Sequence, residues 1–234
     1  MAKKNVKHST IPWFISIPRT GSNWIQGMME LYFDRPRGPI LNLKSDSGRR
    51  ARKFRWVYPD NIGEGDLLWN HHHDQQGFDV RPSTSVHGDI FLYRNPMDVV
   101  YSNCKRDGNE RRRIHFSHEY NATFTKWTLT NQAKTFICYE DMVDDPISEF
   151  KKIVDHFNAE WDEDKFKEAY EKVTKKALVE RGGSVKEVAY PEMLTKQYQD
   201  ERVTFRRRVK GEVKGIVYRE QTAPLLDRYF KEEE

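Results

Sequence analysis

Cysteine is scarce in this sequence, and long apolar runs are missing from it. Its two cysteines, Cys104 and Cys138, are too few for a disulfide framework and lack the spacing of a zinc site, which favours a reduced, cytoplasmic setting. No run approaches the about 18 consecutive apolar residues of a membrane span. The basic N-terminus, MAKKNVKHSTIPW, also lacks the apolar core of a secretory signal. We therefore expect neither a membrane span nor a secretory leader.

Internal repeats and low-complexity linkers are absent too, so no composition shift divides the chain. A length of 234 residues fits one α/β domain that can bury a core, and we expect residues 1–234 to form a single domain. The aromatic content of 13% excludes a disordered chain. The net charge of +4 permits an anionic ligand without indicating nucleic acid, so we expect no nucleic-acid partner.

Apolar patterns predict strands that alternate with helices. Strands are expected at 12–17, 66–70, 89–93 and 134–139, where short runs are rich in β-branched and aromatic residues. Helices are expected from residue 23, from Pro96, and at 145–158, 162–180 and 223–234. Residues 34–63 and the stretch from 181 to 222 are expected to be loop or coil. This order predicts a three-layer α/β fold with a central, mainly parallel sheet flanked by helices.

The segment PRTGSNW, residues 18–24, directly follows the first expected strand and opens a helix. Such a turn at the carboxyl edge of a parallel sheet is where these folds bind ligands, and the first-turn amides of the helix favour an anion. Gly21 permits close backbone approach, and Arg19 adds a bidentate positive charge. Ser22 and Asn23 can cap the helix. The segment predicts a phosphate or sulfate cradle; a structural glycine beside an exposed arginine is the alternative.

A second candidate segment, YRNPMDVVYS, follows the strand expected at 89–93. Arg94 lies at the strand end, near the same sheet edge, and Ser102 comes two helical turns later. An arginine and a serine can share one phosphate group. The alternative is an arginine that caps neighbouring carbonyl groups and a serine that is buried in the helix.

Four ordered segments resemble the sulfotransferases that use 3′-phosphoadenosine-5′-phosphosulfate (PAPS), as a compact member of the cytosolic type. PRTGSNW is similar to the family's 5′-phosphosulfate loop, and YRNPMDVVYS to its 3′-phosphate motif, with the arginine and serine eight residues apart. ICYEDMVDDPISEFKKIVDHF and FRRRVKGEVKG resemble two later motifs. The resemblance spans about residues 12–230, and it implies the P-loop-kinase-like sulfotransferase architecture.

The resemblance implies a role for each motif residue. The 5′-phosphosulfate would be held by Arg19, Thr20, Gly21, Ser22, Asn23 and Trp24, with Trp24 near the adenine. The 3′-phosphate would be held by Arg94, Ser102, Arg206 and Arg207. Arg19 would also be catalytic, because it would meet the charge that builds on the oxygen bridging to the departing nucleotide. Phe205 lies one residue out of register with the family's adenine-stacking aromatic and is not assigned.

Histidine suits the removal of an acceptor proton near neutral pH, and LLWNHHHD, residues 67–74, holds the only histidine cluster. The family has a catalytic histidine here, in a Lys-Thr-His run. The separation of 22 residues from Arg94 matches the family and selects His72 as the base. His71 comes second, because a shift of one residue changes the face that is presented, and His73 stays open.

Alternatives to this assignment are left open by the residues. Adjacent histidines lack the spacing of metal ligands, and we expect no metal requirement; exposed loop histidines are a further interpretation. His87 and His115 are substitute candidates for the base. Asn70 stands where the family has lysine, so part of the leaving-group help is missing or comes from elsewhere.

The sequence thus predicts an enzyme that moves a sulfuryl group from PAPS to a hydroxyl or amine by in-line transfer and releases 3′,5′-ADP (PAP). The acceptor is a small molecule, a sugar or a peptide. An ATP-dependent nucleoside or nucleotide kinase is disfavoured by the missing GxxxxGK[ST] segment. A nucleotide-binding module without a base is the non-enzymatic alternative. The oligomeric state is open, because the family's dimerisation signature is not present from Lys214 to Pro224.

Basic residues gather in three runs, at 49–55, 106–113 and 206–210. A solvated face is the simplest interpretation of each run. In the family's arrangement Arg111, Arg112 and Arg113 would lie beside the acceptor. An anionic or already sulfated acceptor is therefore a further hypothesis for these three residues.

Overall fold

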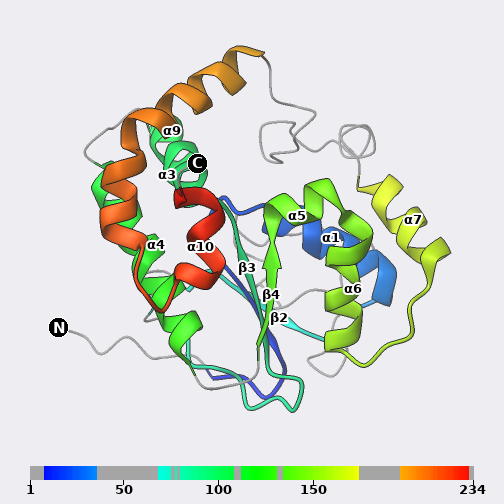
Figure 1. Cartoon of the computed structure of the whole chain (residues 1–234). Coiled ribbons are helices and arrows are strands. Elements are labelled where there is room, and N and C mark those ends of the chain that lie inside the picture. The colour runs from blue at the N-terminus through cyan, green and yellow to red at the C-terminus, as the bar shows by residue number, and fades with distance from the viewer. Residues whose placement is uncertain are drawn as a thin grey trace.

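A computed structural model describes residues 8–35, 68–74, 77, 80–107, 112–130, 134–173 and 196–231. Their strands are all parallel and form one sheet in the order β2-β1-β3-β4 (Figure 1). The strands are β1 (Trp13–Ser16), β2 (Asn70–His72), β3 (Asp89–Tyr93) and β4 (Lys134–Cys138). Because the strands are parallel, their carboxyl ends meet at one edge of the sheet.

Helices cover both faces of this sheet (Figure 1). One face carries α1 (Ser22–Phe33), α5 (Tyr139–Asp144), α6 (Pro146–His156) and α7 (Glu163–Lys172). The other face carries α3 (Pro96–Asp107), α4 (Arg112–Leu129), α9 (Lys196–Val217) and α10 (Ala223–Phe230). The three-layer α/β fold expected from the sequence is confirmed.

Each face of the sheet has its own hydrophobic core. Successive residues of a strand point to opposite faces, so Phe14 of β1 packs against α1 and α6, whereas Trp13 and Ile15 pack against α3, α4 and α9. Every residue of β1 and β3 is buried, which is typical of a parallel sheet covered on both sides. The same alternation decides to which face each histidine of β2 points.

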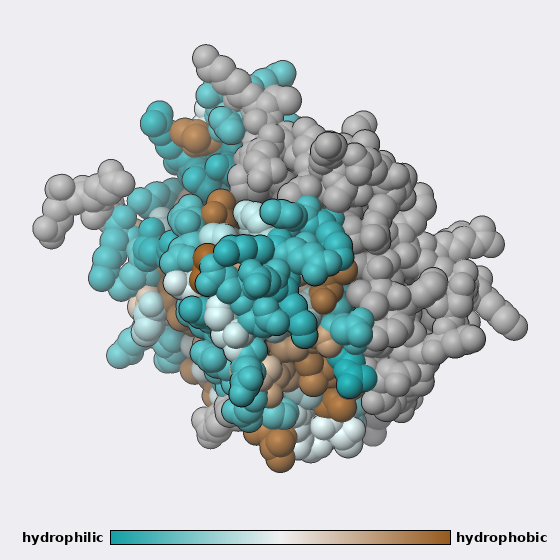
Figure 2. Space-filling model, turned by 90° about the vertical axis from the view of Figure 1, so that its right-hand side faces the viewer, coloured by the Kyte–Doolittle hydropathy of each residue, from teal (hydrophilic) through white to brown (hydrophobic). Residues whose placement is uncertain are grey.

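The outer surface of α7 is charged. Glu163, Lys167 and Glu168 are exposed, while Phe166 and Ala169 face the core, and Figure 2 shows this side of the molecule as mainly hydrophilic. Helices of this kind gain most of their stability from the buried stripe. Within the described ranges, no helix is both long and apolar enough to span a bilayer.

Several predicted elements coincide with observed ones. The strand expected at 89–93 is β3, and the helix expected from Pro96 is α3. The helix expected at 145–158 is α6, which begins at Pro146 after Asp145 accepts a hydrogen bond from the Ser148 backbone N–H at 3.1 Å. Local signals therefore sufficed where a capping residue or a proline marks the helix start.

The coil expected from residue 181 to 222 is wrong over residues 196–217, which form α9, whereas 218–222 is neither helix nor strand. Four apolar residues at intervals of four form the buried stripe of α9: Phe205, Val209, Val213 and Val217. Charged residues on the other faces and two glycines obscured this stripe in the sequence. A Cβ atom at Gly211 or Gly215 would meet nothing within 4 Å, so these glycines cost helix propensity without disturbing any packing.

The strand expected at 66–70 is wrong in position. β2 begins at Asn70 and ends at His72, so two histidines are part of the strand rather than of a loop after it. Leu68 and Trp69 precede the strand and pack against the core of α1. The apolar residues Leu68 and Trp69 therefore pack into the core next to β2 and are not part of the strand. The helix α4 has no counterpart among the predicted elements.

Some predictions fall on residues that lie outside the described ranges. These are the loop expected at 36–63 with its basic run at 49–55, the first two residues of the strand expected at 66–70, and the residues 108–111. The continuation of the expected helix over 174–180, the expected coil at 181–195 and the last three residues of the helix expected at 223–234 also lie outside. Arg111 is among them, so its predicted place beside an acceptor stays a prediction.

A candidate anion-binding site at the carboxyl edge of the sheet

The loop after β1 is a tight turn with a constrained backbone. The Thr20 backbone N–H and hydroxyl both donate to the Ile17 carbonyl oxygen, at 3.3 and 2.7 Å. Pro18 and Arg19 form the centre of the turn, and Arg19 has φ 76°, as the third residue of a type II turn requires. A non-glycine residue at positive φ costs of order 1 kcal/mol, which is typical of functional sites. The Thr20 side chain, predicted to contact a phosphosulfate, is buried and used inside this turn.

Gly21 follows with φ 88° and lies directly before the first turn of α1. A Cβ atom at this position would lie 2.5 Å from Cε2 of Tyr139. Only glycine fits both the left-handed backbone and this close approach. Trp24 is buried one helical turn onward, with its ring 6.0 Å from that of Tyr139 in an edge arrangement. The aromatic ring of Tyr139 thus forms the wall against which the loop rests.

Arg94 lies at the carboxyl end of β3 and is 5% exposed. Its Nη1 donates to the Arg19 carbonyl oxygen at 3.2 Å, and its guanidinium lies over the Tyr139 ring at 4.3 Å from the centroid. The Tyr120 hydroxyl donates to the Arg94 carbonyl oxygen at 2.7 Å and holds its backbone. Arg94 therefore ties the loop after β1 to the end of β3, as expected for strand ends that meet at one edge.

The two predicted phosphate motifs are in direct contact. Arg19 Nε donates to the hydroxyl oxygen of Ser102 at 3.0 Å, across 83 residues of sequence. Ser102 lies on α3 and is buried, and Arg19 is half-buried. The side chains assigned to opposite ends of one nucleotide thus lie next to each other at the carboxyl edge.

Asp98, on the first turn of α3, collects three guanidinium groups. Arg206 of α9 donates two hydrogen bonds to the Asp98 carboxylate. Its Nε donates to Oδ1 at 2.6 Å, and its Nη2 donates to Oδ2. Arg94 Nη2 lies 3.8 Å from Oδ2, and Arg202 Nε lies 3.7 Å from Oδ1. Burial opposes the charged form of Arg206, but the hydrogen bond and attraction of Asp98 raise its pKa above the ordinary value.

Positive charge exceeds negative charge in this cluster, which we call the Asp98 cluster (Arg94, Asp98, Arg202 and Arg206). The Nε atoms of Arg94 and Arg202 are buried, and neither donates a hydrogen bond to a described residue. A buried donor without an acceptor costs free energy. The oxygens of a phosphate would satisfy both donors and balance the excess charge. Glu140 Oε1 lies 4.0 Å from Arg94 Nε and adds a second negative charge beside the cluster. The remaining positive charge and the two unused donors still favour an anion here.

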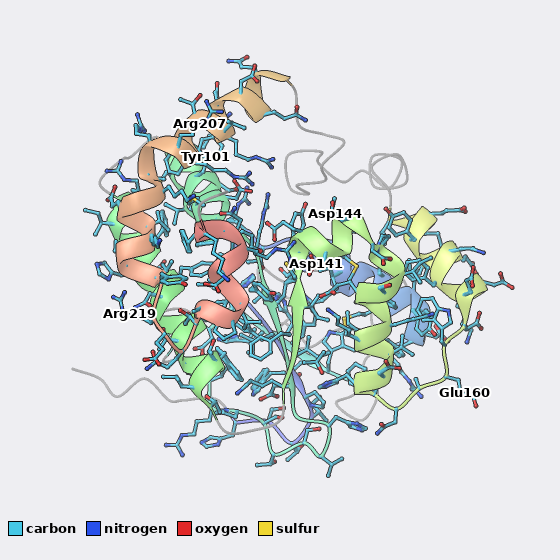
Figure 3. All side chains as sticks on the ribbon, in the orientation of Figure 1. Tyr101, Asp141, Asp144, Glu160, Arg207 and Arg219 are labelled. Atoms are coloured by element: carbon cyan, nitrogen blue, oxygen red, sulfur yellow. The ribbon has the colours of Figure 1, made fainter. Side chains whose placement is uncertain are left out.

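Arg207 points elsewhere. With Arg206 it lines a pocket of about 420 Å³ between α9, α10 and α5, and Figure 3 shows Arg207 on α9 and Asp144 on α5, on opposite sides of the gap between these helices. The pocket is lined by Asn95, Met97, Glu140, Asp144, Arg206, Arg207, Lys210, Arg228 and Tyr229. Arg207 is exposed and forms no ion pair with a described residue. The predicted basic pair thus divides, with Arg206 alone of the two contacting Asp98.

The three histidines alternate between the two faces of the sheet. His71 and His73 point to the face of Phe14 and meet at Ser16, whose hydroxyl oxygen lies 3.3 Å from His71 Nε2 and 2.9 Å from His73 Nδ1. Their rings are 4.7 Å apart. His72 points to the opposite face, where its ring lies 6.0 Å from that of Trp13. His73 lies beyond the end of β2 and is therefore nearest to the carboxyl edge.

The hydrogen bonds of His73 define its tautomer. Its Nδ1 lies 3.1 Å from the Ser16 carbonyl oxygen, and because a carbonyl oxygen can only accept, Nδ1 must carry the proton. Nε2 then has the free lone pair of a base. Burial lowers the pKa of His73 below 6.5, and the hydrogen bond to Ser16 partly offsets this effect. His73 is thus a neutral imidazole at neutral pH.

Asp74 anchors the end of the histidine segment on α4. Its buried carboxylate accepts from the Trp127 indole N–H at 2.8 Å and pairs with Lys126. The Thr123 hydroxyl donates to the Asp74 carbonyl oxygen. These contacts fix the backbone directly after His73, while Ser16 binds the His73 ring.

The other predicted residues lie apart from the Asp98 cluster. His87 Nδ1 lies 3.1 Å from the His156 carbonyl oxygen at the opposite edge of the sheet. His115 is exposed on the outer side of α4 and pairs with Glu119. Phe205 packs on Tyr101 within the core, with ring centroids 5.0 Å apart.

The remaining motif and acceptor-side residues have separate surroundings. Ser22 is buried and Asn23 half-buried in the first turn of α1. Arg112 is exposed, while Arg113 donates to Glu212 of α9 at 2.9 Å. Among described residues no group of three or more histidine, cysteine, aspartate or glutamate side chains could hold a metal ion.

Sequence reasoning missed three residues of the site. Asp98 and Tyr139 stand inside quoted motifs, but no spacing argument singled them out. Arg202 precedes Arg206 by four residues, a spacing that places both on one helical face. That signal was hidden because residues 196–217 were expected to be coil.

No family model matches the chain, and no curated protein matches its sequence. Among solved structures, mouse sulfotransferase SULT7A1 complexed with PAP is similar, with 14% identity, a TM-score of 0.59, and coverage of 96% of this chain and 89% of that one. A retinol dehydratase in complex with androsterone and inactive cofactor PAP has 12% identity, a TM-score of 0.53, and coverage of 92% and 84%.

The sulfotransferase domain of the Synechococcus PCC 7002 olefin synthase is also similar, with 15% identity and a TM-score of 0.51 over 90% of this chain and 97% of that one. At such identities the likeness establishes the fold. The expected architecture, that of PAPS-dependent sulfotransferases, is thereby confirmed at the level of the fold.

Proposed function

We propose that this chain, which has the sulfotransferase fold, is a PAPS-dependent sulfotransferase that transfers a sulfuryl group to a hydroxyl or amine. One observation carries the proposal: guanidinium groups from the loop after β1, from β3 and from α9 gather at the carboxyl edge with more donors than acceptors. Similar structures were crystallised with PAP, which has phosphate groups at two ends.

The nucleotide would be held at two places by residues that are already adjacent. Its 5′ end would lie at Arg19, Gly21 and the first-turn amides of α1, where the helix dipole favours an anion. Its 3′-phosphate would lie at Arg94, Ser102 and Arg206. We keep Thr20, Ser22, Asn23, Trp24 and Arg207 as predicted contributors to the same site.

PAPS would supply an activated sulfuryl group, so the protein's task is positioning, charge stabilisation and proton removal. Arg19 presents a half-buried, always charged guanidinium at a strained turn that is tied down by Arg94. A cation fixed in this way stabilises negative charge that develops beside it, and its position needs no rearrangement during the reaction. The close packing of Gly21 on Tyr139 keeps the loop rigid.

For the base we favour His73. Its Nδ1–H is held by the Ser16 carbonyl oxygen, its Nε2 lone pair is available, and Asp74 fixes the following backbone. The spacing argument selected His72, with His71 second, and both stay competing predictions. The opposite directions of His72 and His73 make the choice testable.

The cofactor is tested first, by thermal unfolding with nucleotides. We expect 3′,5′-ADP without metal to raise the unfolding temperature. At a nucleotide concentration of a hundred times Kd, the unfolding free energy should rise by about 2.7 kcal/mol. A rise with ATP and Mg²⁺ only would favour a kinase and overturn the proposal. Binding of 3′,5′-ADP without sulfate transfer to a panel of phenols, sugars, amines and tyrosine peptides would indicate a non-catalytic module.

The base is tested by three alanine variants, once an acceptor is found with labelled PAPS. His73→Ala should lower kcat by about 10²–10⁴-fold while the affinity for 3′,5′-ADP is kept. His72→Ala and His71→Ala should each lower kcat by less. A loss of that size at His72 instead would restore the assignment made from spacing.

A further inference from the structure

We infer that Arg202, rather than Arg207, is the partner of Arg206 in binding the 3′-phosphate. The inference rests on the proposed function, because it concerns one end of the proposed nucleotide. The resemblance of FRRRVKGEVKG to a family motif gave the role to the adjacent pair Arg206 and Arg207. Because this segment is an α-helix, the role of binding the 3′-phosphate falls instead to Arg202 and Arg206, which are four residues apart.

Helix geometry separates the two candidate pairs. Successive residues of an α-helix are about 100° apart around its axis, whereas residues four apart lie on one face about one turn from each other. Arg202 and Arg206 accordingly both reach Asp98, at 3.7 and 2.6 Å. Arg207 is exposed and lines the same pocket as Arg206 and Lys210, but unlike Arg206 it has no contact with Asp98.

The hydrogen-bond balance of the Asp98 cluster points to the same residue. Three guanidinium groups share one carboxylate that is 2% exposed. Arg206 uses both oxygens of Asp98 in hydrogen bonds, so Arg94 and Arg202 are within ion-pair distance only. Their buried Nε–H groups have no acceptor among the described residues. A phosphate beside Asp98 would accept from both.

Asp98 explains how the three cations are held close before a ligand binds. Like charges at this distance repel each other strongly in a partly buried site, and the carboxylate compensates part of that repulsion. Glu140, whose Oε1 lies 4.0 Å from Arg94 Nε, is a second carboxylate beside these cations. Three positive charges against two negative charges leave a net positive charge that favours an anion. Arg202 therefore contributes to discrimination between a nucleotide with a 3′-phosphate and one without it.

The test compares the binding of 3′,5′-ADP and of 5′-AMP, which lacks the 3′-phosphate, by calorimetry on the full chain. Arg202→Gln should weaken 3′,5′-ADP about ten- to a hundredfold, as the loss of a hydrogen bond to a charged group does, and should change 5′-AMP less than twofold. Arg208→Gln is the matched control on the same helix, because Arg208 is exposed and lies over the ring of Phe205.

Arg207→Gln is the competing variant. A selective loss of 3′,5′-ADP affinity at Arg207 with none at Arg202 overturns the inference and leaves the proposed function intact. A wild-type chain that binds neither nucleotide overturns both. Should Arg202→Gln fail to fold, Arg202→Lys replaces it: that variant keeps the charge but lacks Nε, and unchanged selectivity in it counts against the inference.

Discussion

Two buried aspartates near the opposite ends of β3 have contrasting surroundings. Asp89, the first residue of β3, is fully buried and accepts hydrogen bonds from the backbone N–H groups of Trp13 at 2.8 Å and Ser83 at 3.0 Å, one on each oxygen. Asp98, just beyond the other end, is surrounded by three guanidinium groups. At Asp89 donors and acceptors match, whereas at Asp98 donors are in excess.

The difference separates a structural carboxylate from one that belongs to a site. Burial raises the pKa of Asp89, and the hydrogen bonds from Ser83 and Trp13 oppose that rise, so its contacts hold β1 and the preceding loop together. A buried cluster with unused donors such as Arg94 Nε has no such balance. The proposed 3′-phosphate would accept hydrogen bonds from these donors.

Among substitutions that test the contrast between Asp89 and Asp98, Asp98→Asn should have the largest effect. Removing the charge leaves three close guanidinium groups with only the more distant Glu140 carboxylate beside them, and we expect the unfolding free energy to fall by about 3 kcal/mol. The same change frees these groups for a phosphate. The stabilisation by 3′,5′-ADP, measured by thermal unfolding at one fixed concentration, should therefore be larger in the variant than in the wild type. A variant that no longer responds to 3′,5′-ADP would contradict this account.

Asp89→Asn is the matched change at the other end of β3. An asparagine oxygen can accept only one of the two backbone hydrogen bonds, so a buried N–H loses its partner and stability should fall by about 2 kcal/mol. The response to 3′,5′-ADP should equal that of the wild type, because no nucleotide contact is predicted there. Denaturant unfolding with and without the nucleotide measures both quantities; a changed nucleotide response would remove the distinction between the two ends.

The edge of Asp89 also holds a histidine that should make stability depend on pH. Burial, and secondarily His87, lower the pKa of His156 to about 4, so the unfolded chain binds a proton more readily between pH 6.5 and 4. This stability is complete above pH 6.5 and is lost as pH falls toward 4. Because the ring is half-buried, we expect a loss of about 1–2 kcal/mol.

Unfolding by denaturant across that pH range measures the effect. His156→Asn retains a hydrogen-bonding group for Thr135 but does not titrate, so its stability should fall less over this range. Equal slopes in the wild type and His156→Asn would count against the assignment.

The smallest expected effect concerns the strained turn at Arg19, at the carboxyl edge of the sheet. Arg19→Gly and Arg19→Ala both remove the side chain, but only alanine retains the cost of φ 76°. The glycine variant should therefore be more stable than the alanine variant by about 1 kcal/mol, the reverse of the usual order. Paired thermal melts test this difference. An alanine variant as stable as the glycine variant would show that the turn is not strained.

Local signals in the sequence predicted a large part of the fold and named several residues of the candidate site. Pro96 and Asp145 mark the starts of α3 and α6, and the apolar run at 89–93 is β3. The sequence also placed Arg94 at the same sheet edge as the loop with Arg19, and Arg94 Nη1 donates to the Arg19 carbonyl oxygen there. The helix α9 was not predictable in this way, because charges and two glycines obscured its apolar stripe.

The sequence by itself determined the turn of Pro18, Arg19 and Gly21 and the strand that leads to Arg94, because backbone sterics and apolar runs act between near neighbours in the chain. Only the tertiary structure decided which histidine faces Ser16 and that Arg206 reaches Asp98 across 108 residues. Such contacts depend on strand register and helix packing. Both are set by burial over the whole chain, so no short segment contains the information.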